Sequence, residues 1–308
     1  MALLRARLFG KFRAEIDDRE LTGLGSSHTR ELICYLLVYR NRPHPRETLA
    51  SLLWDTQSTA QARKNLRQAL WQLQAILTAH TVDHAQAWLD IDPEWVGVNP
   101  EAELWLDVAE FEAAFGMVRG VQGTDLQPHQ VRGLENAVRL YQGDLLEGWY
   151  QDWCLYERER LQQMWLAILD KLLAYCETHG LYEDGLAHGS LALSCDRARE
   201  KTHRRVMRLH YLAGDRTSAV RQYQRCVASL EQELGVEPSE RTQALHKRIL
   251  AGSPVEPVEA VEMSPAPASL AQPNPVSRLT QLHRILVQVQ SHVGQDLEII
   301  ERALGDSG

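Results

Sequence analysis

The sequence contains few cysteines, and their arrangement does not indicate disulfides or a metal site. Five cysteines, at positions 34, 154, 176, 195 and 226, are scattered without paired spacing along 308 residues. Thiols of this kind are typical of a reducing compartment, so we expect a cytoplasmic protein. The first nine residues mix arginines with apolar side chains and show no cleavage site, so we expect no secretory signal. No apolar run is long enough to predict a membrane span.

Common signatures of catalytic and nucleotide-binding sites are also missing. The chain has no Walker-type phosphate loop, no GxGxxG after a predicted strand, no GxSxG and no HExxH. His80 and His84 are four residues apart, but Asp83 is the only evident third ligand, so we expect no metal site. In YERERL, Glu157 and Glu159 alternate with arginines, which predicts ion pairs on a solvated helix face. We therefore expect a protein that is not an enzyme and needs no cofactor.

Basic residues are scarce in the whole chain but concentrated near its N-terminus. The formal net charge of the chain is −8. Residues 1–80 hold 12 Lys and Arg against 7 Asp and Glu, whereas residues 81–308 hold 21 against 34. Residues 81–118 contain nine acidic residues and no Lys or Arg. Positive charge confined to one region indicates contact with a polyanion there.

Residues 59–77 have the pattern of an amphipathic helix with a cationic face. An apolar stripe is formed by residues spaced four, three and four apart, namely Leu66, Leu70, Leu73 and Leu77. The opposite face and its flanks hold Gln61, Lys64, Gln68, Trp71, Arg67 and Gln72. Ser58 and Gln61 have capping-box spacing at the start of the helix. Cations and amides suit phosphates and base edges, although an ordinary surface helix shares this pattern.

The segments around this helix complete the layout of a winged helix. A helix is expected from Ser26 or Ser27 to near Arg40, and the prolines of residues 41–45 end it. A short helix follows over residues 46–53, with Pro45 suited to a first helical position. The remaining expected elements are strands over residues 3–9 and 12–16 and a hairpin of residues 88–91 and 96–99.

These segments resemble a known family of regulators. LFGKFRAEID, TRELICYLLVYRNRPHPRETLASLLW and ARKNLRQALWQLQAIL are similar to the winged helix of SARP-type bacterial transcriptional regulators, which is related to the OmpR/PhoB winged helix. WLDVAEFEAAF, YQGDLLEGWYQDW, ERERLQQMWLAILDKL and GDRTSAVRQYQRCVASLEQELGVEPS are similar to the bacterial transcriptional activator domain, which is built of tetratricopeptide-like repeats. The resemblance covers about residues 1–250. It implies sequence-specific binding to promoter repeats by adjacent protomers and recruitment of RNA polymerase.

The resemblance implies DNA-binding roles for residues of the cationic helix, namely Lys64, Asn65, Arg67, Gln68, Trp71 and Gln72. Arg46, at the start of the preceding helix, is a candidate phosphate contact because helix N-termini favour anions. The expected hairpin lacks the cation that a DNA-contacting wing usually offers. It could meet phosphate through backbone amides or Trp95, or it could face a neighbouring protomer.

A second set of helices has a repeat of its own. Gly180 and Gly214 are 34 residues apart, which is the tetratricopeptide period. Helices are expected over residues 130–143, 153–178, 183–194, 198–213, 216–234 and 239–250. Helical hairpins need neighbours to bury their apolar faces, so these helices predict a small solenoid. Beyond them, a proline-rich segment predicts a flexible linker, and a heptad-like seam predicts a helix that self-associates or docks.

Together these patterns predict a mainly α protein. It would comprise a winged helix-turn-helix with small β elements (1–105), a tetratricopeptide-like activator domain (106–250), a linker (251–278) and an amphipathic helix (279–304). The expected function is transcription regulation by an oligomer that binds double-stranded promoter DNA and contacts RNA polymerase, without a membrane. The alternative is a protein-interaction scaffold whose winged helix does not recognise DNA.

Overall fold

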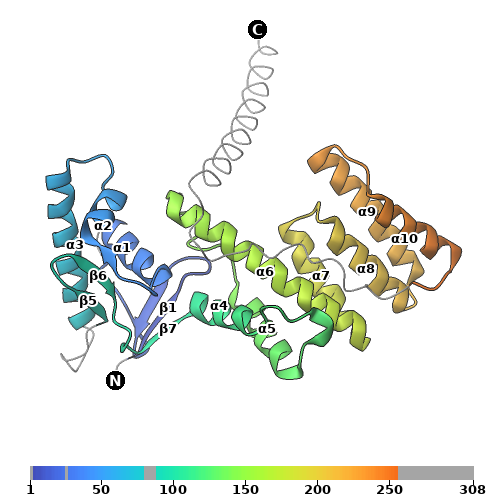
Figure 1. Ribbon diagram of the computed structural model, residues 1–308, viewed down its shortest axis with the longest axis horizontal. Coiled ribbons are helices and arrows are strands. Elements are labelled where there is room, and N and C mark those ends of the chain that lie inside the picture. The colour runs from blue at the N-terminus through green and yellow to red at the C-terminus, as the bar shows by residue number, and fades with distance from the viewer. Residues whose placement is uncertain (1–2, 25–26, 80–87, 256–308) are drawn as a thin grey trace, which may run out of the picture. The chain divides into compact units, whose positions relative to one another are not determined.

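The computed structural model describes residues 3–24, 27–79 and 88–255, which belong to one compact unit (Figure 1). As expected, these residues are mostly helical, with small strands near the N-terminus. None of the helices within those three ranges is long and apolar enough to cross a membrane. The cap expected at Ser26, the histidines at 80 and 84, most of the linker and the predicted helix 279–304 lie outside the described residues.

The N-terminal sheet joins residues from both ends of the winged-helix region. Its order is β3-β2-β1-β7, with β1 antiparallel to β2 and parallel to β7. The strands are β1 Leu4–Arg7, β2 Arg13–Ile16, β3 Arg19–Glu20 and β7 Leu104–Leu106. Alternate side chains of β1 and β2 are buried, which explains why these two strands were predictable. The short strands β3 and β7 were not predicted.

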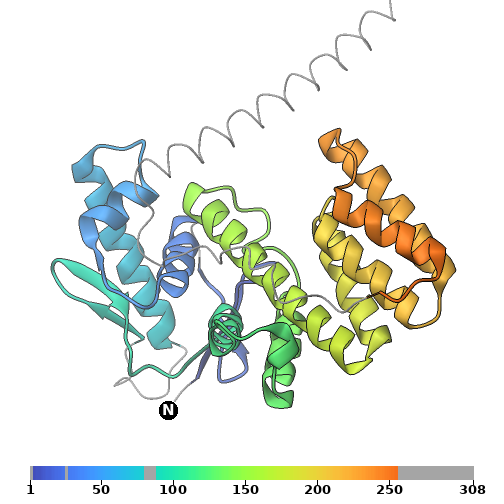
Figure 2. The ribbon, with the colours of Figure 1, turned by 45° about the vertical axis from the view of Figure 1, so that its right-hand side comes forward.

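The helix-turn-helix follows the predicted pattern closely. Its helices are α1 Ser27–Val38, α2 Arg46–Leu53 and α3 Thr59–Ala79. Pro45 does not open α2 as expected, because it lies in the two-residue strand β4 His44–Pro45 and caps the helix from outside. This strand pairs with the predicted hairpin, giving a second sheet of order β4-β6-β5. The hairpin, β5 Leu89–Ile91 and β6 Trp95–Val98, lies beside the helices (Figure 2).

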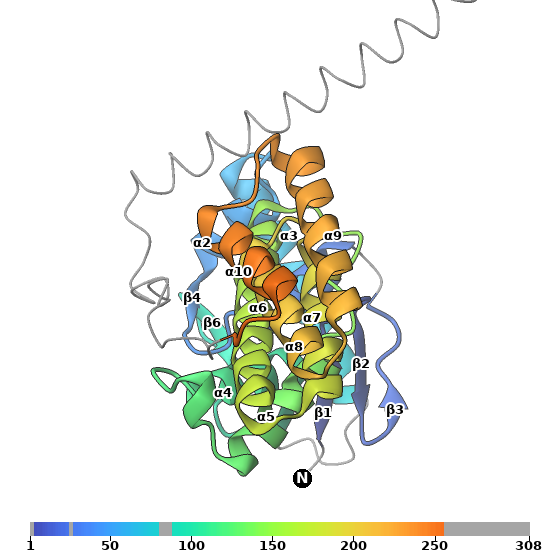
Figure 3. The same ribbon diagram turned by 90° about the vertical axis from the view of Figure 1, so that its right-hand side faces the viewer.

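Successive helices of residues 107–251 pack against one another, as the predicted solenoid requires. They are α4 Asp107–Met117, the short 3-10 helix η1 Gly123–Asp125, α5 Pro128–Leu140, α6 Asp152–His179, α7 Tyr182–Cys195, α8 Glu200–Leu212, α9 Arg216–Leu234 and α10 Glu240–Ala251. The contacts run from α6 to α7, α8 and α9, and then to α10 (Figures 1 and 3). Gly180 and Gly214, the basis of the 34-residue repeat, have positive φ angles of 70° and 82° and end α6 and follow α8.

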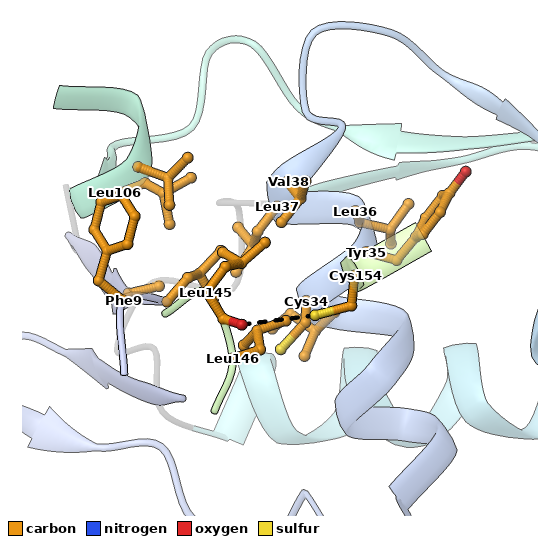
Figure 4. Packing of buried hydrophobic residues seen from close by; sticks show 14 of the residues in the cluster. Phe9, Cys34, Tyr35, Leu36, Leu37, Val38, Leu106, Leu145, Leu146 and Cys154 are labelled. Atoms are coloured by element: carbon orange, nitrogen blue, oxygen red, sulfur yellow. Dashed lines mark hydrogen bonds between the residues drawn. The ribbon is translucent and has the colours of Figure 1, made fainter. Parts of the chain in front are cut away.

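One core extends from the winged helix into the following helices. The turn after β1 is held by residues 144–147: the Gly10 amide donates to the Asp144 carbonyl, and the Leu146 amide donates to the Leu8 carbonyl, both at 2.8 Å. Phe9 packs beside Leu145, and buried Cys34 and Cys154 lie in the same cluster (Figure 4). All five cysteines are free thiols.

The contact between η1 and α6 predicts a strong effect of one methyl group. A Cβ added at Gly123 would lie 2.5 Å from the Lys171 carbonyl oxygen and 2.6 Å from the Ala174 Cβ. We expect Gly123→Ala to lower the free energy of unfolding by about 2–3 kcal/mol, because backbone must move to admit it. Gly116→Ala in α4 is the matched control, since its Cβ would meet nothing within 4 Å. Urea unfolding of both variants checks this, and equal stabilities would contradict it.

Candidate nucleic-acid interface

Helix α3 presents an open face because its leucines anchor the opposite side. Leu66, Leu70, Leu73 and Leu77 are all buried, as predicted. The predicted DNA-binding residues on the open face are Lys64, Arg67, Gln68 and Trp71. Trp71 has 69% of its surface exposed. The exposed face thus combines two cations, an amide and an indole.

Two other predicted contacts, Asn65 and Gln72, lie at the edges of this face and are half-buried. Gln72 accepts a hydrogen bond from the Thr29 hydroxyl of α1 at 3.2 Å. Asn65 donates to the Gln57 side chain at 2.7 Å and accepts from Gln61 at 2.9 Å. The structure therefore brings four of the six helix candidates together on open surface and engages the other two with neighbouring residues.

The expected capping box at the start of α3 is formed only in part. The Gln61 backbone amide donates to the Ser58 hydroxyl at 3.4 Å, which satisfies one amide of the first turn. The Gln61 side chain turns the other way and donates to Asn65 instead of reaching back to Ser58. The Asn65 side chain is thereby bonded both to Gln61 in the first turn of α3 and to Gln57 before it.

Arg46 connects α2 to the hairpin rather than standing free. Its guanidinium donates to the Asp92 carbonyl at 2.9 Å, and its backbone amide donates to the Glu94 carbonyl at 2.8 Å. The Asp92 carboxylate in turn accepts from the amides of Glu94 and Trp95 at 2.8 and 2.6 Å. One of the amides that a phosphate would use at the start of α2 is therefore already bonded to the hairpin turn. Sequence reasoning missed this contact because it depends on the position of a segment 46 residues away.

The hairpin supplies exposed apolar surface and no cation. Trp95 is 42% exposed at its turn. On the neighbouring helices, the exposed Arg63 of α3 forms an ion pair with Glu47 of α2, so its charge is partly compensated. Among the described residues, Lys64 and Arg67 are the cations of α3 that form no ion pair. No group of three His, Cys, Asp or Glu side chains within the described ranges could hold a metal ion.

Helix α1 links this interface to the helices that follow. Trp153 of α6 donates from its indole to the Glu31 carboxylate at 3.2 Å, and burial raises the pKa of that carboxyl. Glu112 of α4 forms ion pairs with Arg40 of the winged helix and Arg160 of α6. No sequence pattern indicated these pairs, since each joins residues far apart in the chain.

The charged residues of YERERL are not all on a solvated face as expected. Glu157 and Arg160 do form the predicted kind of ion pair, at 2.7 Å, but both side chains are largely buried. Arg158 donates to the backbone carbonyls of Leu145, Leu146 and Trp149 and so holds the loop before α6. These arginines therefore stabilise the region where the winged helix meets the helices that follow. Of the charged residues of YERERL, Glu159 alone is exposed.

Comparisons with known proteins match this architecture. The model of the bacterial transcriptional activator domain matches residues 106–250. These residues are therefore similar to a bacterial transcriptional activator domain. Regulatory protein AfsR of Streptomyces coelicolor is 25% identical over 268 residues, covering 87% of this chain and 26% of AfsR. Transcriptional regulatory protein MoaR1 of Mycobacterium tuberculosis is 23% identical over 252 residues, covering 76% of this chain and 75% of MoaR1. The chain spans about a quarter of the length of AfsR.

A solved structure supports the fold beyond the activator domain. Mycobacterium tuberculosis EmbR, determined in complex with a low-affinity phosphopeptide, superposes with a TM-score of 0.63 at 21% identity. The match covers 83% of this chain and 67% of that chain, and at this identity it concerns the fold alone. The predicted resemblance to SARP-type regulators is confirmed, because the activator domain and the relatives are those of transcriptional regulators.

Proposed function

We propose that this protein regulates transcription by binding promoter DNA sequence-specifically through the open face of α3. The observation that supports this most is the set of Lys64, Arg67, Gln68 and Trp71 on one exposed face of the third helix of a helix-turn-helix. The activator domain that follows belongs to proteins named as transcriptional regulators. The residues on this face of α3 are suited to binding rather than to catalysis.

Different side chains would supply affinity and specificity. Cations next to phosphates provide a salt-dependent attraction that is the same for every sequence. The Gln68 amide has a donor and an acceptor, so it can form paired hydrogen bonds with an adenine edge in the major groove. Arg46 would act evenly on all sequences, because its contact with Asp92 positions the hairpin and its charge lies at the start of α2.

We expect Gln68→Ala to relax base preference by about 1–3 kcal/mol at one position, while Arg46→Ala weakens binding to all sequences alike. The full chain is used to select DNA from a randomised library, and each variant is then measured against matched and mismatched duplexes. Unchanged selectivity of Gln68→Ala would count against α3 as the recognition helix. The full chain is required because Asp107 and residues 144–147 hold the winged helix.

The same selection would report how two protomers are arranged on DNA. Two protomers bound side by side would select a direct repeat, and the distance between the repeats would give the spacing of the protomers. Contact with RNA polymerase is proposed for the solenoid, whose stacked helices offer an extended binding surface. We place this activity in the activator domain because α3 already supplies the DNA contacts.

One observation favours the alternative of a protein-interaction scaffold. The hairpin lacks cations, and its turn occupies the start of α2, so two usual phosphate contacts of a winged helix are weakened. A scaffold would bind DNA without sequence preference, or not at all at physiological salt. Selection of no enriched sequence by the full chain at low salt would favour the scaffold over the regulator.

A further inference from the structure

The exposed face of α3 changes character half-way along the helix. Its first half holds Lys64, Arg67 and Gln68. From Gln68 to Ala79 the sequence contains no charged residue, yet the same face continues through Trp71, Ala75 and Thr78. At about 100° per residue, these three lie within about 40° of the direction of Lys64. The second half is therefore a continuation of the proposed DNA-binding face that lacks charge.

This second half is open and apolar. Trp71 leaves 69% of its surface exposed, although an indole is among the most costly side chains to leave in water. A shallow surface depression beside it is lined by Trp71, Gln74, Ala75, Thr78 and Ala79. All five residues are exposed, and Ala75, Thr78 and Ala79 each carry a methyl group. Such a surface suits a partner that presents an apolar group within a polar setting.

The major groove of DNA presents one apolar group of this kind. The C5-methyl of thymine is the only alkyl group on a base edge, and alanine and threonine methyl groups and aromatic rings are its usual protein contacts. Seven residues separate Lys64 from Trp71, which is about 10 Å along a helix, or roughly three base pairs. A helix whose Lys64 contacts a base edge therefore carries Trp71 to a base further along the same groove.

We propose that Trp71 and Ala75 recognise thymine through its C5-methyl group, on the flank of the site beyond the bases contacted by Lys64 and Gln68. The inference rests on the proposed DNA binding and names the base class that this part of α3 prefers. Thr78 extends the same contact by a further helical turn. Specificity on this flank would thus come from methyl burial rather than from charge or paired hydrogen bonds.

Deoxyuridine substitution tests this directly, because it removes only the C5-methyl group of thymine. The duplex selected by the full chain is prepared with each thymine replaced in turn, and dissociation constants are measured at one salt concentration. We expect one or two positions on one flank to weaken binding by about three- to five-fold, the effect of one buried methyl group. Trp71→Ala should bind thymine and deoxyuridine at those positions equally.

Tyr150→Ala is the matched control, since it removes an exposed aromatic ring outside the winged helix and should keep the full deoxyuridine effect. A selected site without thymine on that flank, or with no sensitive thymine, would overturn the inference while leaving the DNA-binding function intact. The inference also fails if Trp71→Ala weakens a complex with RNA polymerase but leaves the deoxyuridine pattern unchanged. Selection of no sequence at all would instead overturn the proposed function, and the inference with it.

Discussion

Asp107→Ala is expected to lower the free energy of unfolding by about 3–5 kcal/mol. The Asp107 side chain is buried, and its carboxylate accepts the backbone amides of Leu8, Phe9 and Val108 at 2.8–3.0 Å. Alanine would leave these buried donors without an acceptor, at about 1–3 kcal/mol for each. Burial raises the pKa of this carboxyl, and the three amide bonds oppose the rise, so the amides are what make a carboxylate tolerable there.

Asp152→Ala is the control for this substitution. Asp152 also lies in the first turn of a helix, but its side chain is exposed. Its loss should cost only the interaction with the helix dipole, about 0.3–1 kcal/mol. Denaturant unfolding of both variants, followed by circular dichroism, measures the difference. A loss below 1 kcal/mol for Asp107→Ala would show that the amides of Leu8 and Phe9 find other partners.

The contacts of Asp107 with the amides of Leu8 and Phe9 could not be predicted from the sequence. Helices α1, α2, α3 and α5–α10 were predictable because each has an apolar stripe, and some have a clear end signal, such as Pro43 after α1 or Gly180 after α6. The junction was not predictable, because Leu8–Gly10 meets residues 144–147 mainly through backbone groups. Backbone amides and carbonyls are common to all residues, so their pairing leaves no pattern in side-chain types.

Two of the segments that suggested the family turn out to contact each other. LFGKFRAEID contains the turn after β1, and YQGDLLEGWYQDW contains the loop that binds it. Each segment was predicted to belong to a separate domain, and nothing in either indicated the other. In the structure, Phe9 and Leu145 share one buried cluster. The two segments are therefore complementary parts of one junction.

The candidate site was predictable to the extent that it depends on one helix. A helical repeat places Lys64, Gln68 and Trp71 opposite the buried leucines whatever surrounds them. Asn65 and Gln72 lie at the edges of the face, where neighbouring segments decide between solvent and contact. Thr29 of α1 engages Gln72, and Gln57 before α3 engages Asn65. Edge positions thus require the tertiary structure, whereas central positions do not.

Lys64→Ala/Arg67→Ala is expected to weaken binding to the selected duplex by roughly 10- to 100-fold at moderate salt. Each cation that contacts the duplex contributes about one unit to the slope of log affinity against log salt. The slope of the variant should therefore be shallower by about two. Both side chains are exposed, and alanine is a good helix former, so the fold of α3 should be retained.

Lys11→Ala/Arg13→Ala makes the same change in net charge at another surface of the winged helix. Both residues are exposed, and Arg13 lies opposite Arg7 in the β1–β2 pair. Like charges placed opposite each other repel, so this control should not destabilise the sheet. If binding depends on the overall positive charge of residues 1–80, both variants lose affinity equally. If it depends on α3, only Lys64→Ala/Arg67→Ala changes the salt slope, because only its cations face the phosphates.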